Sequence, residues 1–128
     1  MIIAGIGCRR GAPANEIEAA IRAALAHAGI SPEALAAIAT ASAKKNEAGI
    51  EAAATRFGVN VVFVSEAELK AASPRTQTES ERALAFLGVG SVAEAAALAA
   101  AGPLSRLIGR RLVLGTATCA LATSEAAA

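Results

Sequence analysis

The chain has 128 residues, enough for one domain with a real core but too few for two substantial ones. It is 55% hydrophobic and only 2% aromatic, and it carries a formal net charge of +1. The scarcity of aromatic residues argues against binding of single-stranded nucleic acid, which usually needs aromatic stacking platforms. The small net charge argues against attraction of the whole protein to a polyanion or a membrane surface.

The first third of the chain predicts a strand, a helix and a second strand. The apolar residues 2–7 end in glycines, as a buried strand does. Apolar residues spaced three and four apart then predict an amphipathic helix, with Pro13 in its first turn and Gly29 after its end. A short helical turn is expected at Ser31-Pro32. Residues 35–41 follow it and stop at a polar cluster, so we expect a strand there.

The middle of the chain repeats this alternation. Residues 44–57 are expected to form a helix that Gly58 ends, and 60–64 form the clearest strand, an apolar β-branched run. Ser65 and Glu68 have the spacing of a capping box, which predicts a short helix after that strand.

The last third of the chain is expected to be more mixed. In order, we predict a flexible polar loop at 71–77, a helix at 80–87, an alanine-rich helix from Ser91 to Gly102-Pro103, strands at 112–114 and 116–122 around Gly115, and a frayed tail after Ser124. A second capping box is expected at Ser91 and Glu94.

This order predicts an α/β fold. We expect a single three-layer domain over residues 1–124, with a mostly parallel sheet, helices on both faces and a disordered tail at 125–128. In such folds ligands bind outside the carboxyl ends of the strands. The loops to examine are therefore those at 7–13, 40–47, 64–68 and 88–94.

The first of these loops, Gly5-Ile6-Gly7-Cys8-Arg9-Arg10-Gly11, is suited to an anionic ligand. Its glycines let the backbone approach a ligand closely, and the following helix presents free N–H groups. Arg9 and Arg10 add guanidinium groups that match a carboxylate or phosphate. The alternative is a tight strand-to-helix turn with two solvated arginines.

A second polar constellation, Thr40, Ser42, Lys44, Lys45 and Glu47, follows the predicted second strand. It is therefore expected on the same edge of the sheet. Its hydroxyl, ammonium and carboxylate groups could bind the acid groups of a ligand and supply one general acid or base. The alternative is a helix cap, with Ser42 at the helix start and Glu47 in the first turns.

A dinucleotide is a poorer match to this edge. The spacing G-x-G-x-x-x-G is one residue longer than the standard fingerprint, and no acid for the ribose follows the second strand. Lys44 could meet a 2′-phosphate, so an NADP-binding module stays open. A P-loop is excluded, because no Gly-Lys-Ser/Thr follows the glycines.

Three residues could take part in catalysis. Glu47 and Glu94 could act as acids or bases, and Cys8 could be a nucleophile favoured by the neighbouring arginines and the helix dipole. The capping box with Ser91 is a sufficient structural reason for Glu94, and no acid–base partner for Cys8 can be identified. We expect the ligand-binding residues to be Gly5, Gly7, Cys8, Arg9, Arg10, Gly11, Thr40, Ser42, Lys44, Lys45, Gly90 and Ser91.

The remaining residues indicate a cytoplasmic protein with reduced thiols. The two cysteines resemble neither a disulfide framework nor a metal cluster, so no metal site is expected. Cys119 is expected in the core and His27 on a helix surface. The apolar start is shorter than a secretory core and has its arginines after it, and no apolar run could span a bilayer.

Four blocks of the sequence, taken together, are specific enough to indicate a protein family. They are Gly5 to Gly11, Ala39-Thr-Ala-Ser-Ala-Lys-Lys-Asn-Glu-Ala-Gly49, Gly88-Val-Gly-Ser-Val-Ala-Glu-Ala-Ala-Ala-Leu98 and Thr116-Ala-Thr-Cys-Ala-Leu-Ala122. In this order and spacing they resemble the CobE family of cobalamin-biosynthesis proteins, which includes the C-terminal domain of CbiG. The resemblance covers nearly the whole chain.

The resemblance implies a protein that acts on or carries a corrin-ring intermediate, of precorrin or hydrogenobyrinic-acid type, with or without cobalt and without a further cofactor. The intermediate's rim carboxylates would suit Arg9, Arg10, Lys44 and Lys45. Other enzymes of the pathway are expected partners, whereas nucleic acid and membranes are not, and no oligomeric state is predicted.

The same resemblance carries an enzymatic alternative. Full-length CbiG is associated with opening the δ-lactone of cobalt-precorrin-5A, which makes lactone hydrolysis an alternative for this chain. The N-terminal regions of CbiG have no counterpart in this sequence. Near Gly115, where the CbiG-type pattern tends to have a lysine, the chain offers Arg110 or Arg111. A binding or carrier role is therefore preferred.

Overall fold

The structure is a computed structural model that describes residues 1–77 and 91–124. The helix predicted at 80–87, the candidate ligand-binding residue Gly90 and the tail at 125–128 lie outside the described residues.

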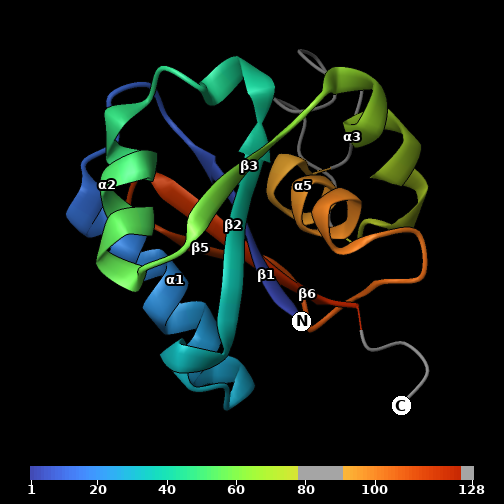
Figure 1. The fold of residues 1–128 in the computed structure, drawn as a ribbon, viewed down its shortest axis with the longest axis horizontal. Helices are drawn as coiled ribbons and strands as arrows, with labels where there is room; N and C mark the ends of the chain where they lie inside the picture. Colours follow the sequence, from blue (N-terminus) through green and yellow to red (C-terminus); the bar gives the residue numbers. More distant parts are fainter. Residues whose placement is uncertain (78–90, 125–128) are drawn as a thin grey trace.

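The fold is built on one mixed sheet, in which β1 (Ile2–Cys8) is central (Figure 1). Parallel pairing joins β1 to β2 (Leu35–Ala41) and β2 to β3 (Asn60–Val64). On the other side of β1, β6 (Ala117–Thr123) runs antiparallel, and both β4 (Arg106–Leu107) and β5 (Leu112–Leu114) pair with β6. The parallel strands end at one edge, as predicted.

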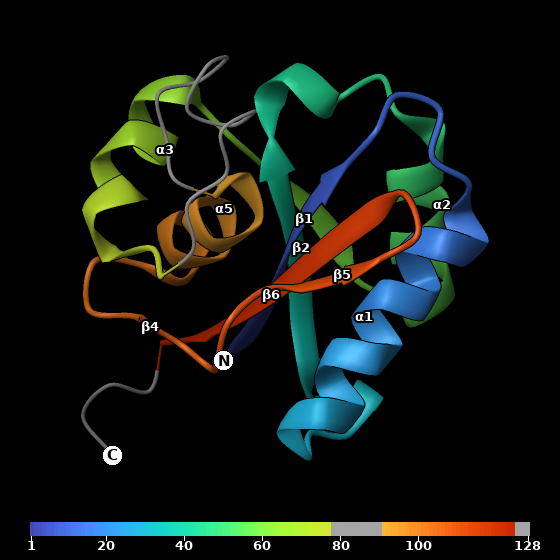
Figure 2. The same ribbon diagram turned by 180° about the vertical axis from the view of Figure 1, so that it is seen from behind.

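Helices cover both faces of this sheet, which confirms the predicted α/β fold class (Figures 1 and 2). One face is covered by α1 (Ala14–Ala28) and α2 (Ala48–Phe57), and the other by α3 (Glu66–Ala72) and α5 (Val92–Ala101). Each face has its own aliphatic core. The α5 side consists largely of alanines, whose small side chains let that helix lie close to the strands.

Gly5 shows how close this approach is. A Cβ at Gly5 would lie 1.9 Å from the carbonyl oxygen of Ala93 and 2.8 Å from the Cβ of Ala97. Since real Cβ atoms do not come so near a backbone oxygen, only glycine fits beneath α5 at this point of β1.

Most predicted boundaries are confirmed. The strands at 35–41, 60–64 and 112–114 have the predicted ends, and the turn at Ser31-Pro32 is a 3-10 helix, η1 (Pro32–Ala34). Gly29 and Gly58 end α1 and α2 in the left-handed conformation. Ser65 and Glu68 form the predicted capping box of α3.

Three expectations need correction. The helix predicted from Lys44 begins at Ala48, because residues 42–44 form the separate 3-10 turn η2 (Ser42–Lys44) and Glu47 is extended, with φ −85° and ψ 100°. Pro13 is the N-cap of α1 and not part of its first turn. The loop predicted at 71–77 continues α3 to Ala72 and then forms η3 (Ser73–Arg75).

Hydrogen bonds explain why the region after α3 is ordered. The Arg75 guanidinium donates to the Ser105 carbonyl at 2.9 Å and to the Gly102 carbonyl at 3.4 Å, and so binds the end of α5. None of the helices within residues 1–77 and 91–124 combines the length and the apolar content needed to cross a membrane.

Candidate functional site

The loops after β1 and β2 lie together at the edge where these strands end. The Gly11 N–H donates to Glu47 Oε1 at 2.8 Å, joining residues 36 positions apart. Beside this bond, a Cβ on Gly49 would come within 2.2 Å of the Ala12 carbonyl oxygen, so the start of α2 is packed directly on the first loop. The two loops therefore lie against each other, as the edge rule predicts.

Four cationic side chains gather on these two loops. Arg9, Arg10 and Lys45 are exposed and Lys44 is half-buried. No ion pair or hydrogen bond engages these side chains within the part of the chain that the structure describes. Within the described residues, the carboxylate near this group is that of Glu47, which bonds to the Gly11 N–H.

The two hydroxyl residues of this edge differ in their surroundings. Thr40 is fully buried, and its hydroxyl donates to the Ile6 carbonyl at 2.9 Å, which joins the ends of β2 and β1. Ser42 is exposed at the start of η2. A direct ligand contact is consequently easier for Ser42 than for Thr40, whose hydroxyl is buried and already donates to a backbone carbonyl.

The glycines of the first loop also differ in how far they are exposed. Gly5 is buried under α5, so the backbone there is covered by protein. Gly7 is half-buried, and a Cβ placed on it would lie 3.9 Å from the Ala93 nitrogen, the nearest atom outside the adjoining residues. Gly11 is exposed with φ +76°, a left-handed conformation that favours glycine.

Cys8 lies at the end of β1 and is half-buried. Burial raises the pKa of its thiol, the nearby Lys44 ammonium lowers it, and the Glu47 carboxylate raises it, with a net increase. The thiol is therefore protonated near neutral pH. This geometry gives Cys8 no activation as a nucleophile.

Glu94 and Ser91 start α5, beside the end of β1. The Ser91 hydroxyl accepts a hydrogen bond from the Glu94 N–H at 3.3 Å, so the predicted N-cap is confirmed. The fully buried Glu94 carboxylate accepts from the backbone N–H groups of Gln77 at 2.9 Å and Arg111 at 3.1 Å. Glu94 thus joins three chain segments, and its burial keeps it from a ligand at the surface.

The β5–β6 hairpin holds the first loop from the other side, a contact that the sequence did not reveal. Glu16 Oε1 accepts from the Thr116 N–H at 3.0 Å and from the Thr116 hydroxyl at 2.7 Å. The Arg9 N–H in turn donates to the Thr116 carbonyl at 3.0 Å. These bonds lower the pKa of Glu16. A partner 100 positions away cannot be read from local pattern.

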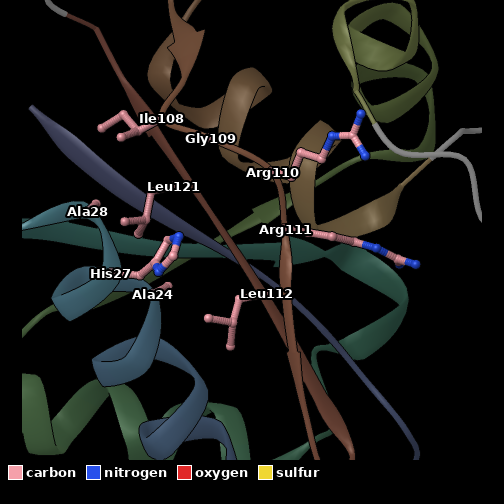
Figure 3. Close-up of a pocket in the computed structure, with 9 residues that line it drawn as sticks. All are labelled: Ala24, His27, Ala28, Ile108, Gly109, Arg110, Arg111, Leu112 and Leu121. Carbon is pink, nitrogen blue, oxygen red and sulfur yellow. The ribbon is translucent and has the colours of Figure 1, made fainter.

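An open pocket of about 340 Å³ lies between the end of α1 and the segment before β5 (Figure 3). Its lining is mostly aliphatic and consists of Ala24, His27, Ala28, Ile108, Gly109, Arg110, Arg111, Leu112 and Leu121. Figure 3 shows the guanidinium groups of Arg110 and Arg111 directed away from the apolar side chains. The expected surface position of His27 is confirmed. Because α1 rises about 1.5 Å per residue, this pocket is roughly 15–20 Å from the first loop and is a separate feature.

Among the described residues, no three His, Cys, Asp or Glu side chains are placed to hold a metal ion. Cys119 is fully buried in β6, as expected.

Comparison with known proteins matches this chain to a protein family. A family model described as "Cobalamin synthesis G C-terminus" matches residues 2–122. The chain is 40% identical to protein CobE of Sinorhizobium sp over 121 residues, which cover 94% of this chain and 79% of that protein. The crystal structure of CobE, a protein from the cobalamin (vitamin B12) biosynthetic pathway, matches with a TM-score of 0.90 and 39% identity, covering 95% of this chain and 89% of that one.

A second relative is an enzyme. The chain is 35% identical to a cobalt-precorrin-5A hydrolase of Priestia megaterium over 98 residues, which cover 77% of this chain and 26% of the hydrolase. The match thus spans about a quarter of the length of that enzyme.

Proposed function

The chain belongs to the cobalamin synthesis G C-terminus family of cobalamin-biosynthesis proteins, and from that premise we propose that it binds a corrin-ring intermediate at the edge formed by its first two loops. The observation that supports this site is the group of cationic side chains, Arg9, Arg10, Lys44 and Lys45, which have no partner ion within the described residues. Corrin intermediates carry acetate and propionate carboxylates around an apolar ring. Such a rim offers several anions at once to these cations.

A binding or carrier role fits this site better than catalysis. The Cys8 thiol is protonated near neutral pH, and the Glu94 carboxylate is fully buried among backbone N–H groups. A carrier needs affinity for its ligand and access for the enzymes that supply and receive it, and it needs no activated nucleophile. We expect other enzymes of the pathway to be those partners.

The test is a titration of the purified protein with hydrogenobyrinic acid, followed by visible absorbance. We expect the ring's spectrum to change on binding, and the affinity to fall as salt is added. Replacing Arg9 and Arg10 by alanine should weaken binding about tenfold, if each charge contributes about 0.7 kcal/mol. Replacing Lys44 and Lys45 should do the same.

The matched control is Lys70→Ala, which removes an exposed cation from α3. Its affinity should equal that of the wild type. A protein that leaves the spectrum unchanged and never co-purifies with a corrinoid does not have the proposed function.

The second candidate is hydrolysis of a corrin lactone, which the similarity to the hydrolase favours. Within this proposal Glu47 is the available acid or base, since it is a half-buried carboxylate among the cations of the site. Turnover of the lactone intermediate by the wild type, and its loss in Glu47→Gln with the fold retained, would establish this activity. For the NADP alternative, we expect NADPH to leave the melting temperature unchanged.

A further inference from the structure

Glu47 uses its side chain in an unexpected way. It is the N-cap residue of α2, yet its carboxylate makes no capping bond to that helix. The carboxylate crosses instead to the first loop, where Oε1 accepts the hydrogen bond from the Gly11 N–H at 2.8 Å. A carboxylate of the protein therefore occupies a backbone donor of the loop that we propose as the anion site.

Three observations make this donor one that a ligand carboxylate could use. Gly11 is exposed, and its φ of +76° is a left-handed conformation that few residues other than glycine adopt. Arg10 precedes it directly and is also exposed. Lys44 and Glu47 both lie close enough to Cys8 to act on its thiol electrostatically, so the carboxylate and the ammonium group face the same end of β1.

We propose that Glu47 is a specificity-determining residue, an internal competitor that a ligand carboxylate must displace from the Gly11 N–H. This inference rests on the proposed function for the identity of the ligand. A ligand with one carboxylate exchanges its bond for the bond of Glu47 and gains nothing. A ligand with several carboxylates replaces that bond and also contacts the cations around it, so it binds with a net gain.

The competition also bears on release. When the ligand leaves, Glu47 returns to the Gly11 N–H, and the bond between the two loops forms again. The affinity of the site is then held below the value that its cations alone would give. A carrier that must pass its ligand to an enzyme benefits from such a limit.

The first experiment needs no corrinoid. In a ¹⁵N-labelled sample, Glu47→Ala should shift the Gly11 amide resonance strongly, because the bond to the carboxylate is lost. Added sodium acetate should then move this resonance in Glu47→Ala but not in the wild type. The control is Glu51→Ala, an exposed carboxylate in the first turn of the same helix, which changes the net charge equally. A Gly11 resonance that is insensitive to Glu47→Ala, or to acetate in that variant, overturns the inference.

The second experiment separates the two proposals. Hydrogenobyrinic acid should bind Glu47→Gln about fivefold more tightly than the wild type, since a charged competitor is replaced by a neutral one, while Glu51→Gln should match the wild type. Weaker binding by Glu47→Gln would show that Glu47 contributes to the ligand contact, which overturns the inference and leaves the proposed function standing. Absence of binding by every variant, with the acetate result positive, would overturn the proposed ligand and retain Glu47 as a competitor for carboxylates.

Discussion

The backbone N–H of Arg111 donates to Glu94 Oε2 across 3.1 Å, which joins the chain just before β5 to the first turn of α5. The carboxylate is fully buried and also accepts from the Gln77 N–H at 2.9 Å. One side chain thus fixes three segments that meet beside the sheet. A residue that the sequence offered as a catalytic candidate is a central structural group of the fold.

Replacing Glu94 by glutamine should therefore destabilise the protein. The amide supplies one acceptor in place of two and turns an N–H donor toward a backbone donor, so we expect the free energy of unfolding to fall by about 2–4 kcal/mol. Urea denaturation measures this change. Glu66→Gln, at an exposed carboxylate in the first turn of α3, is the control and should stay within about 0.5 kcal/mol of the wild type. Equal stability of the two variants would contradict the structural role of Glu94.

A second prediction concerns the contact between β1 and α5. Gly5→Ala places a methyl group 1.9 Å from the Ala93 carbonyl oxygen, so α5 must move away from the sheet. We expect a loss of about 3 kcal/mol or more in the free energy of unfolding, or failure to fold. Gly7→Ala, on the same strand, places its methyl group 3.9 Å from the Ala93 nitrogen, an ordinary van der Waals distance, and should cost less than about 1 kcal/mol. The difference between the two urea midpoints tests the packing; similar midpoints would show that α5 lies farther from β1.

The strands and the two loops of the site could be predicted because their signals are local. Apolar runs bounded by glycines and polar clusters give β2 and β3 their ends, and the rule that parallel strands end at one edge brings the first two loops together. The start of α2 could not be predicted, because residues 44–47 are compatible with a helix. In the structure Glu47 is extended and its carboxylate bonds to the Gly11 N–H, a contact 36 positions away that local sequence does not reveal.

Long-range hydrogen bonds account for most of what the sequence did not show. A glutamate at position 94 can be explained by the capping box with Ser91 or by a catalytic role. Neither explanation predicts that its carboxylate accepts from the backbone N–H groups of Gln77 and Arg111. The hydroxyl of Thr40 looked available to a ligand, but its partner is a carbonyl on the neighbouring strand. The hydrogen-bond partner of a buried polar side chain depends on which segments the fold brings beside it, and a single sequence does not show this directly.

Acid should weaken the contact between α1 and the β5–β6 hairpin. Hydrogen bonds from the Thr116 hydroxyl and N–H lower the pKa of Glu16 from its ordinary value of 4.5. Because the pKa is lower in the folded state, the contact contributes its full stability above about pH 4.5 and loses it as the pH falls through the folded-state pKa. The urea midpoint of the wild type should therefore exceed that of Glu16→Gln at pH 7, and the difference should shrink by pH 3. A difference that does not depend on pH would show that the charge of Glu16 is not involved.

The two thiols should react very differently. Cys119 is fully buried in β6, and burial raises its pKa to about 12, whereas Cys8 is half-buried and its pKa is raised by burial from the ordinary value of 9.0. Since the thiolate is the reactive form, Ellman's reagent should modify one thiol in the folded protein, slowly at pH 7 and faster as the pH rises toward 9, and both thiols in urea. Cys8→Ser should abolish the reaction of the folded protein, and Cys119→Ser should leave it unchanged.

Bound corrinoid should protect Cys8, because the thiol lies beside Lys44 and Glu47 at the proposed site. Rapid modification at neutral pH would mean that the thiol is activated, and would return Cys8 to the list of catalytic candidates.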